Sequence, residues 1–117
     1  MNFPRRGEIW LVSLDPTIGR EIGKTRPALV ISNDRNNQFS DTVTVIPITS
    51  KKTERIYPFE TFLSSQETHL PQDSKAKANQ IRTVDKKRLI KHLTKLSFDR
   101  LSEIEQAILV HLGISFH

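Results

Sequence analysis

The loop at residues 19–27, Gly-Arg-Glu-Ile-Gly-Lys-Thr-Arg-Pro, carries three cations and one carboxylate and runs directly into the apolar residues 28–31. Pro27 fixes its own φ and biases the preceding residue towards extended backbone, so Arg26 enters the next strand in a held conformation. A guanidinium is planar, stays charged and binds phosphate through two parallel hydrogen bonds. The loop therefore indicates phosphate chemistry centred on Arg26.

A partner for Arg26 follows from spacing. Residues 26–33 and 41–49 read as strands, and the polar residues 34–41 between them predict a hairpin loop. Symmetric pairing places residues opposite each other when their numbers sum to 75, so Arg26 faces Thr49. Opposed residues point to the same side of a sheet with Cβ atoms roughly 5 Å apart. A register slip of one residue would bring Ile48 to Arg26 and remove the contact.

The elements that must position this pair are mainly strands. Residues 7–14 have apolar side chains at both odd- and even-numbered positions, which point to opposite faces of a strand. This pattern predicts a strand covered on both faces, as in a small barrel. Further strands are predicted at residues 58–63 and 76–83, and a short helix or turn at 85–91.

The end of the chain changes to helical spacing. Ser97 is the predicted N-cap, Asp99 lies in the first turn, and Gly113 is the predicted C′ residue of an amphipathic helix. Strands followed by one packing helix are typical of an α+β fold, mainly β, built on a small, twisted antiparallel sheet.

Composition narrows the function. The 117 residues suit a single domain spanning 1–117, and the absence of cysteine excludes disulfides and thiolate sites. No apolar run reaches the length of a signal or membrane segment, so we expect a cytoplasmic protein without a membrane partner. The net charge is +5, and residues 72–91, with seven basic and two acidic side chains, account for all of it. A polyanion is the natural partner for this segment, and a solvated basic face is the alternative.

Five motifs occur in order: Arg6-Gly7-Glu8-Ile9-Trp10, Asp15-Pro16-Thr17, the loop at 19–27, Val45-Ile46-Pro47-Ile48-Thr49-Ser50, and the run from Asn79-Gln80-Ile81-Arg82 to Leu89. Their order and spacing resemble the MazF/PemK family of toxin endoribonucleases. The resemblance implies a PemK/CcdB-like toxin fold, a homodimer of SH3-like barrels each ending in an amphipathic helix.

The resemblance also implies the activity. The chain would be the toxin of a type II toxin–antitoxin pair that cleaves single-stranded mRNA selectively, without metal or cofactor. Attack by the 2′-OH would leave a 2′,3′-cyclic phosphate and a 5′-OH. A cognate antitoxin would silence it with a disordered C-terminal tail in the RNA groove, and the +5 charge favours acidic residues in that tail.

The resemblance assigns catalysis to Arg26 and Thr49. Arg26 fits charge stabilisation better than the role of base, because a guanidinium does not lose its proton appreciably. Glu21 is the nearby carboxylate and a candidate general base, with an ion pair to a loop cation as the alternative. Expected RNA-binding residues are Arg20, Lys24, Lys77, Asn79, Gln80 and Arg82. Arg20 and Asn79 stand where relatives carry histidine and aspartate, which argues against a His/Asp mechanism.

Other candidates are weaker. Asn37 suits reading of base edges, and Phe39 or Tyr57 suits base stacking, although core packing is the alternative for each ring. Trp10 is expected in the core or at a dimer interface. The histidines, His69, His92, His111 and His117, show neither paired catalytic spacing nor metal-ligand spacing, so no metal site is expected.

Two other functions compete. A non-catalytic toxin of the same barrel class would act on a protein target such as gyrase through its C-terminal helix. A plain RNA-binding module would need the basic residues 72–91 but no arrangement of Glu21, Arg26 and Thr49.

Overall fold

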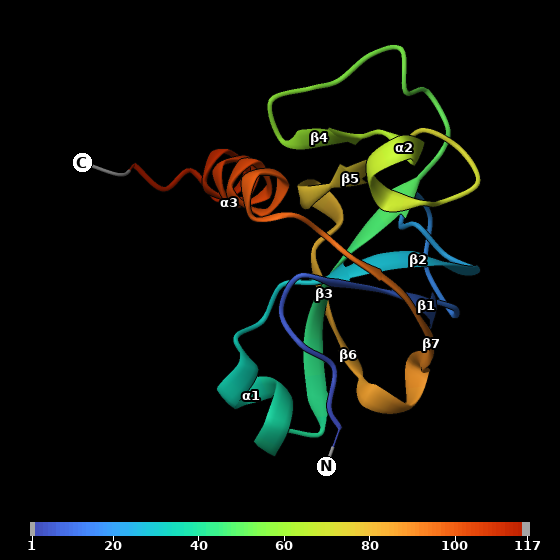
Figure 1. Ribbon diagram of the computed structural model, residues 1–117, viewed down its shortest axis with the longest axis vertical. Helices are drawn as coiled ribbons and strands as arrows, with labels where there is room; N and C mark the ends of the chain where they lie inside the picture. Colours follow the sequence, from blue (N-terminus) through green and yellow to red (C-terminus); the bar gives the residue numbers. More distant parts are fainter. Residues whose placement is uncertain (1, 116–117) are drawn as a thin grey trace.

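The computed structural model describes residues 2–115 and consists of one twisted antiparallel sheet with a long helix on one side (Figure 1). The strands follow the order β4-β5-β3-β2-β1-β7, and β6 also pairs with β3. Their bounds are β1 Glu8–Ser13, β2 Thr25–Val30, β3 Thr42–Thr49, β4 Glu60–Leu63, β5 Ser74–Lys77, β6 Arg82–Asp85 and β7 Leu89–Lys95. The helices are α1 Asp34–Phe39, α2 Ser65–Thr68 and α3 Phe98–Leu112, with 3₁₀ turns η1 Ala78–Gln80 and η2 Lys86–Arg88. Within residues 2–115, β4 and β7 are the two edge strands of this order and do not pair with each other. The barrel-like sheet is therefore not closed.

Both faces of the sheet are covered, as the double-sided pattern of residues 7–14 predicts. Ile9 of β1 belongs to a core shared with Ile104 and Ala107 of α3. Val12 and Leu14 face the opposite way, into a second core formed by the valines of β2, β3 and β6. Alternate residues of one strand therefore supply two cores, one on each face of the twisted sheet.

The hairpin register is confirmed. Ala28 lies opposite Pro47, Leu29 opposite Ile46 and Val30 opposite Val45, and each pair of numbers sums to 75. The connection itself differs from the predicted loop, because residues 34–39 form helix α1. Asn33 caps this helix by accepting a hydrogen bond from the backbone N–H of Asn36. Short polar side chains occur both at helix N-caps and in turns, so their presence does not distinguish the two.

The single strand predicted at 76–83 is wrong. The segment contains β5, the turn η1 and β6, and both strands pair with β3. Ala76 lies opposite Ile48 at the end of β3, whereas Arg82 lies opposite Val45. The three residues of η1 are the extra length needed to shift from one register to the other, and strand propensity does not reveal such a shift.

Residues 85–91 are also only partly as predicted. The turn η2 ends at Arg88, and β7 then runs from Leu89 to Lys95 beside β1. This edge strand is mostly exposed and rich in lysine, a composition that protects sheet edges but hides the strand signal in the sequence.

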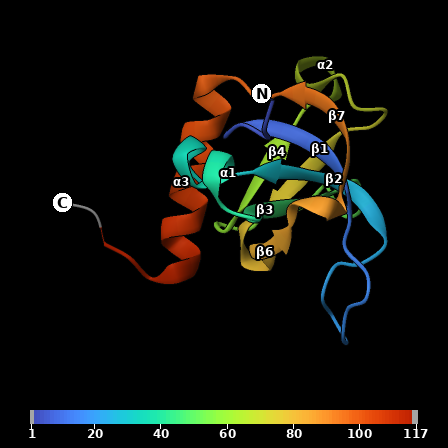
Figure 2. The ribbon, with the colours of Figure 1, turned by 90° about the horizontal axis from the view of Figure 1, so that it is seen from below.

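The terminal helix agrees with its predicted caps. The Ser97 hydroxyl accepts from the N–H of Arg100, and Gly113 has the left-handed φ of 68° that favours glycine. No helix among residues 2–115 has the length and apolar character required to cross a membrane. Helix α3 packs along one side of the sheet, and the loop between β1 and β2 stands out on the opposite side (Figure 2).

Candidate active site

Arg26 lies at the start of β2, opposite Val12 of β1. Its Nε donates a hydrogen bond to the carbonyl oxygen of Gly23 at 2.8 Å, so the guanidinium is tied to its own loop. A Cβ built on Gly23 would lie 2.3 Å from Oδ1 of Asp15, so the absence of a side chain there permits this close loop packing. The loop therefore holds Arg26 in the defined orientation that its sequence predicts.

Arg26 and Thr49 line one cavity. Continuing the β2/β3 register by two residues places them opposite each other, and the cavity between them has a volume of about 200 Å³. We call this cavity the Arg26 pocket; its lining residues are Ile22, Arg26, Thr49, Lys51, Lys52, Lys75 and Lys77. Arg26 also borders a neighbouring cavity of about 290 Å³ that extends towards Ser50 and Gln72.

The Arg26 pocket is strongly cationic, because one arginine and four lysines line it. Two of these lysines share a buried carboxylate. Lys75 Nζ lies 2.9 Å from Glu60 Oε1, and Lys77 Nζ lies 3.6 Å from Glu60 Oε2. Lys75 and Glu60 are only 3% and 6% exposed, so this pairing is shielded from water. One carboxylate against five cations leaves an excess of positive charge suited to a phosphate.

Glu60 remains ionised in this setting. Burial raises the pKa of its carboxyl, but the hydrogen bond from the Tyr57 N–H and the ammonium groups of Lys75 and Lys77 lower it more, and the pKa lies below its ordinary value. The ionised carboxylate thus lies between two lysines that line the pocket.

Neither Glu60 nor Lys75 is among the residues that the sequence singles out. The relevant signal is the register of β5, which places Lys75 opposite Thr49 and Lys77 opposite Glu60. The strand predicted at residues 76–83 begins one residue too late to include Lys75, so the prediction does not contain the pair of Lys75 and Thr49.

Glu21 lies in a different cavity from Arg26. Its carboxylate accepts a hydrogen bond from the Ile18 N–H within the loop. The cavity, about 340 Å³ in volume, is here called the Gln80 pocket and is lined by Ile18, Arg20, Glu21, Asn79, Gln80, Ile81 and Arg82. The structure thus brings together four predicted RNA-binding residues with Glu21, and separates Glu21 from Arg26 and Thr49.

Gln80 holds the β1–β2 loop. Its Oε1 accepts from the Ile22 N–H at 3.1 Å, and its Nε2 donates to the Arg20 carbonyl at 3.4 Å. Arg82 donates to the carbonyl of Leu14 at 3.0 Å, at the base of the same loop. These side chains therefore position the loop in addition to lining the pocket.

Asn79 and Lys24 complete the predicted set. Oδ1 of Asn79 is buried without a hydrogen-bond partner among the described residues. Lys24 is exposed and has a φ of 65°, in the left-handed region, so its side chain projects from a constrained turn.

The predicted edge-reading role of Asn37 is wrong. Asn37 is fully buried, and its amide donates to the Ser32 carbonyl at 2.8 Å, so it is a structural group on the buried side of α1. The aromatic candidates stay accessible, with Phe39 75% and Tyr57 42% exposed. Trp10 is half-buried against the second core and contacts His92 edge to face.

The histidines are scattered. His92 lies 3.4 Å from Glu8, His69 ends α2 and His111 lies in the last turn of α3. His117 lies outside the described residues. Across residues 2–115 no three His, Asp or Glu side chains gather into a possible metal site.

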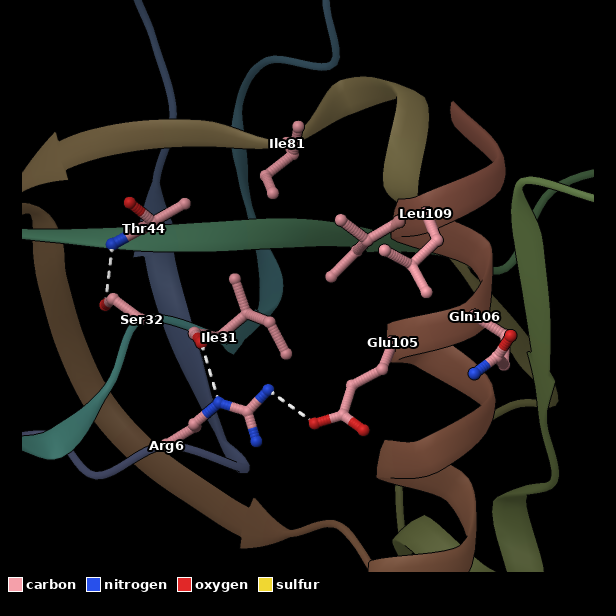
Figure 3. A pocket seen from close by; sticks show the side chains of 9 residues that line it. Arg6, Ile31, Ser32, Thr44, Ile81, Glu105, Gln106 and Leu109 are labelled. Carbon is pink, nitrogen blue, oxygen red and sulfur yellow. Dashed lines mark hydrogen bonds and ion pairs between the residues drawn. The ribbon is translucent and has the colours of Figure 1, made fainter. Parts of the chain in front are cut away.

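A larger cavity lies elsewhere. It has a volume of about 630 Å³ and lies between part of α3 and the sheet (Figure 3). Arg6 reaches into it and donates to the Ile31 carbonyl at 2.9 Å and to Glu105 at 2.8 Å. None of the predicted site residues lines this cavity.

A small twisted antiparallel sheet with one long terminal helix and a cationic pocket at the open end of its central hairpin defines a small barrel-like protein of SH3-like class. Residues 5–112 match the family described as PemK-like, MazF-like toxin of type II toxin-antitoxin system. The chain therefore belongs to this toxin family.

Individual relatives agree. The chain is similar to endoribonuclease MazF9 of Mycobacterium tuberculosis, with 41% identity over 115 residues that span 94% of this chain and 97% of MazF9. Its fold is similar to that of MazF from Deinococcus radiodurans, with 29% identity, a TM-score of 0.82 and coverage of 97% of this chain and 99% of that one. It is also similar to a chain of a MazE–MazF crystal structure from the same organism, with 27% identity, a TM-score of 0.76 and coverage of 96% and 98%.

Proposed function

We propose that this toxin is a sequence-selective endoribonuclease that cleaves single-stranded mRNA in the cytoplasm, as a single domain over residues 1–117. The observation that carries the proposal is the Arg26 pocket, in which a held guanidinium, a threonine hydroxyl and several ammonium groups converge. The 41% identity to an endoribonuclease supports the same activity.

The proposed reaction uses the 2′-OH of the RNA as the nucleophile. The 2′ oxygen forms a bond to phosphorus while the bond to the 5′ oxygen breaks, giving a 2′,3′-cyclic phosphate and a 5′-OH. The 2′-OH gives up its proton to a base, and the 5′ oxygen gains one. Arg26 stabilises the charge on the phosphoryl oxygens, and Thr49 positions the phosphate through its hydroxyl. Lys77 supplies further charge from the pocket wall.

The Gln80 pocket is proposed to bind a flanking nucleotide. Arg20 and Arg82 provide positive charge there, and the amides of Asn79 and Gln80 suit base edges. Lys24 adds charge at the loop surface. General base catalysis by Glu21 stays a prediction, because its carboxylate lines this pocket and not the Arg26 pocket.

The partners follow from the family. The toxin forms a homodimer, and its cognate antitoxin inhibits it with an acidic C-terminal tail that competes for the cationic pockets. The MazE–MazF crystal structure supports such a complex, and the net charge of +5 favours an acidic partner.

The decisive experiment compares the wild type with Arg26→Ala on a mixed-sequence RNA in excess chelator. We expect discrete fragments with 5′-OH ends from the wild type and intact RNA from the variant, with the fold and dimer retained. Arg26→Lys, which keeps the charge but loses the planar fork, should cleave slowly. Equal cleavage by the wild type and Arg26→Ala would reject the assignment.

The rivals give different results. A toxin directed at a protein such as gyrase leaves the RNA intact and does not depend on Arg26, and an RNA-binding module binds the RNA without cutting it.

A further inference from the structure

Tyr57 is an exposed aromatic ring in a run of three alternating side chains before β4. The ring of Tyr57 lies parallel to that of Phe59, with centroids 5.5 Å apart and an interplanar angle of 2°. The guanidinium of Arg55 lies 5.2 Å from the Tyr57 centroid. The hydrogen bond from the Glu60 N–H to the Tyr57 carbonyl closes a turn over residues 57–60, and this turn brings the two rings together.

The backbone of Tyr57 is held firmly although its ring is exposed. Its N–H donates to Oε1 of Glu60 at 3.0 Å, and its carbonyl accepts from the Glu60 N–H at 2.8 Å. Lys75 ties this turn to β5, because its Nζ donates both to Glu60 and to the carbonyl of Arg55, at 2.9 and 3.0 Å. The ring therefore stands on a rigid support, which lowers the entropic cost of binding a ligand.

Lys75 connects the Tyr57 ring to the Arg26 pocket. Nζ of Lys75 lies 5.9 Å from the Tyr57 centroid, and Lys75 lines the pocket together with Arg26 and Thr49. A nucleotide with its phosphate in this pocket can direct its base towards Tyr57.

Core packing does not account for this arrangement. The Tyr57 ring is 42% exposed and lies outside both hydrophobic cores, whereas Phe59 behind it is half-buried. Unpaired RNA bases bind to aromatic and guanidinium planes, and both planes are present here.

We propose that Tyr57, supported by Phe59 and flanked by Arg55, is a stacking platform for the base of a nucleotide adjoining the scissile phosphate. The proposal rests on the endoribonuclease function and adds a base-binding site to it. The base inserts against the outer face of Tyr57, and the exposed Arg55 side chain moves to cover it.

The test uses synthetic oligonucleotides that contain the preferred cleavage site, defined by sequencing the 5′ ends of fragments from a long RNA. One series carries an abasic nucleotide at each position near the scissile bond in turn. The enzyme variants are Tyr57→Leu, which keeps apolar volume beside Phe59, and Tyr57→Phe, which keeps the ring. Phe98→Ala is the control, since Phe98 is 85% exposed at the start of α3.

We expect Tyr57→Leu to lower kcat/KM about 5- to 150-fold on the intact oligonucleotide, the effect of losing one base-stacking contact. Tyr57→Phe and Phe98→Ala should retain wild-type values. One abasic position should reduce wild-type cleavage by a similar factor and cause no additional loss in Tyr57→Leu.

Two results would overturn the proposed stacking platform. One is a wild-type kcat/KM for Tyr57→Leu, and the other is a further fall in the kcat/KM of that variant at every abasic position. Failure of the endoribonuclease function is distinguishable, because the wild type itself would then leave RNA intact. Binding of a mixed-sequence single-stranded RNA still tests the platform in that case. Tyr57→Leu should weaken that binding by the same factor, and unchanged binding would reject the platform.

Discussion

Thr49 and Lys75 lie directly opposite each other in the antiparallel ladder of β3 and β5. Continued two residues beyond Ala28 and Pro47, where the β2/β3 ladder ends, the register places Arg26 on the other side of Thr49. The three residues line one cavity as a row across three adjacent strands. Opposed residues point to the same face of a sheet, and this row is therefore the floor of the Arg26 pocket.

The role of the Thr49 hydroxyl in this row can be tested by substitution. Thr49→Val keeps the shape of the side chain but removes Oγ1, which now accepts from the Lys51 N–H at 3.1 Å. We expect kcat to fall about 10²- to 10³-fold, as for loss of one preorganised polar contact to the transition state. Single-turnover cleavage measures this effect. Thr49→Ser should stay close to the wild type, and equal rates for the valine and serine variants would contradict the proposed role.

Glu60 links stability to pH. Its pKa in the folded protein lies below the ordinary carboxyl value of 4.5, so its contribution to stability is present above that value and is lost as the pH falls through the lowered folded pKa. Glu60→Gln leaves the buried ammonium of Lys75 without its carboxylate, and we expect a loss of about 3–5 kcal/mol at neutral pH. Urea unfolding at neutral and acidic pH measures the free energy of unfolding.

The difference between Glu60→Gln and the wild type should shrink in acid, where the wild-type carboxyl is itself protonated. The double variant Glu60→Gln/Lys75→Met removes the unpaired charge and should recover part of the stability. A difference that is constant with pH would show that the ion pair does not act as described.

Gln80 tests how the loop is held. Gln80→Ala removes the hydrogen bonds to Ile22 and Arg20, each worth about 0.5–1.5 kcal/mol. The global fold should change little, but trypsin should cleave after Arg20 and Lys24 faster, and KM for RNA should rise. Gln38→Ala, on the exposed surface of α1, is the matched control. Unchanged proteolysis in Gln80→Ala would show that the loop is ordered by other contacts.

Lys51 and Lys52 test the charge of the pocket. Both are exposed and line the Arg26 pocket, so each is expected to contact RNA phosphate. Each lost contact should reduce the slope of log binding constant against log salt by about 0.7 for single-stranded RNA. Lys51→Met/Lys52→Met should therefore bind an uncleavable oligonucleotide with a slope shallower by roughly 1.4. If the double variant binds more weakly but with the same salt slope as the wild type, the two lysines do not contact phosphate.

Local pattern was sufficient for the central hairpin and the terminal helix. The register of β2 and β3 follows from symmetric pairing across a short connection, and it holds although α1 occupies the predicted loop. Ser97 and Gly113 mark the ends of α3, because capping is a property of the residues at the helix ends themselves.

The sequence by itself determined the register of β2 and β3 and the cationic character of the loop before β2, since both follow from one hairpin and the residues beside it. Tertiary structure decided that Lys75 and the buried Glu60 complete the pocket, that Glu21 lies in a separate cavity, and that Asn37 is internal. The first of these outcomes depends on which strands pair, and in which register, over long separations. A shift of one residue turns a side chain to the other face of the sheet, and local periodicity does not specify that choice.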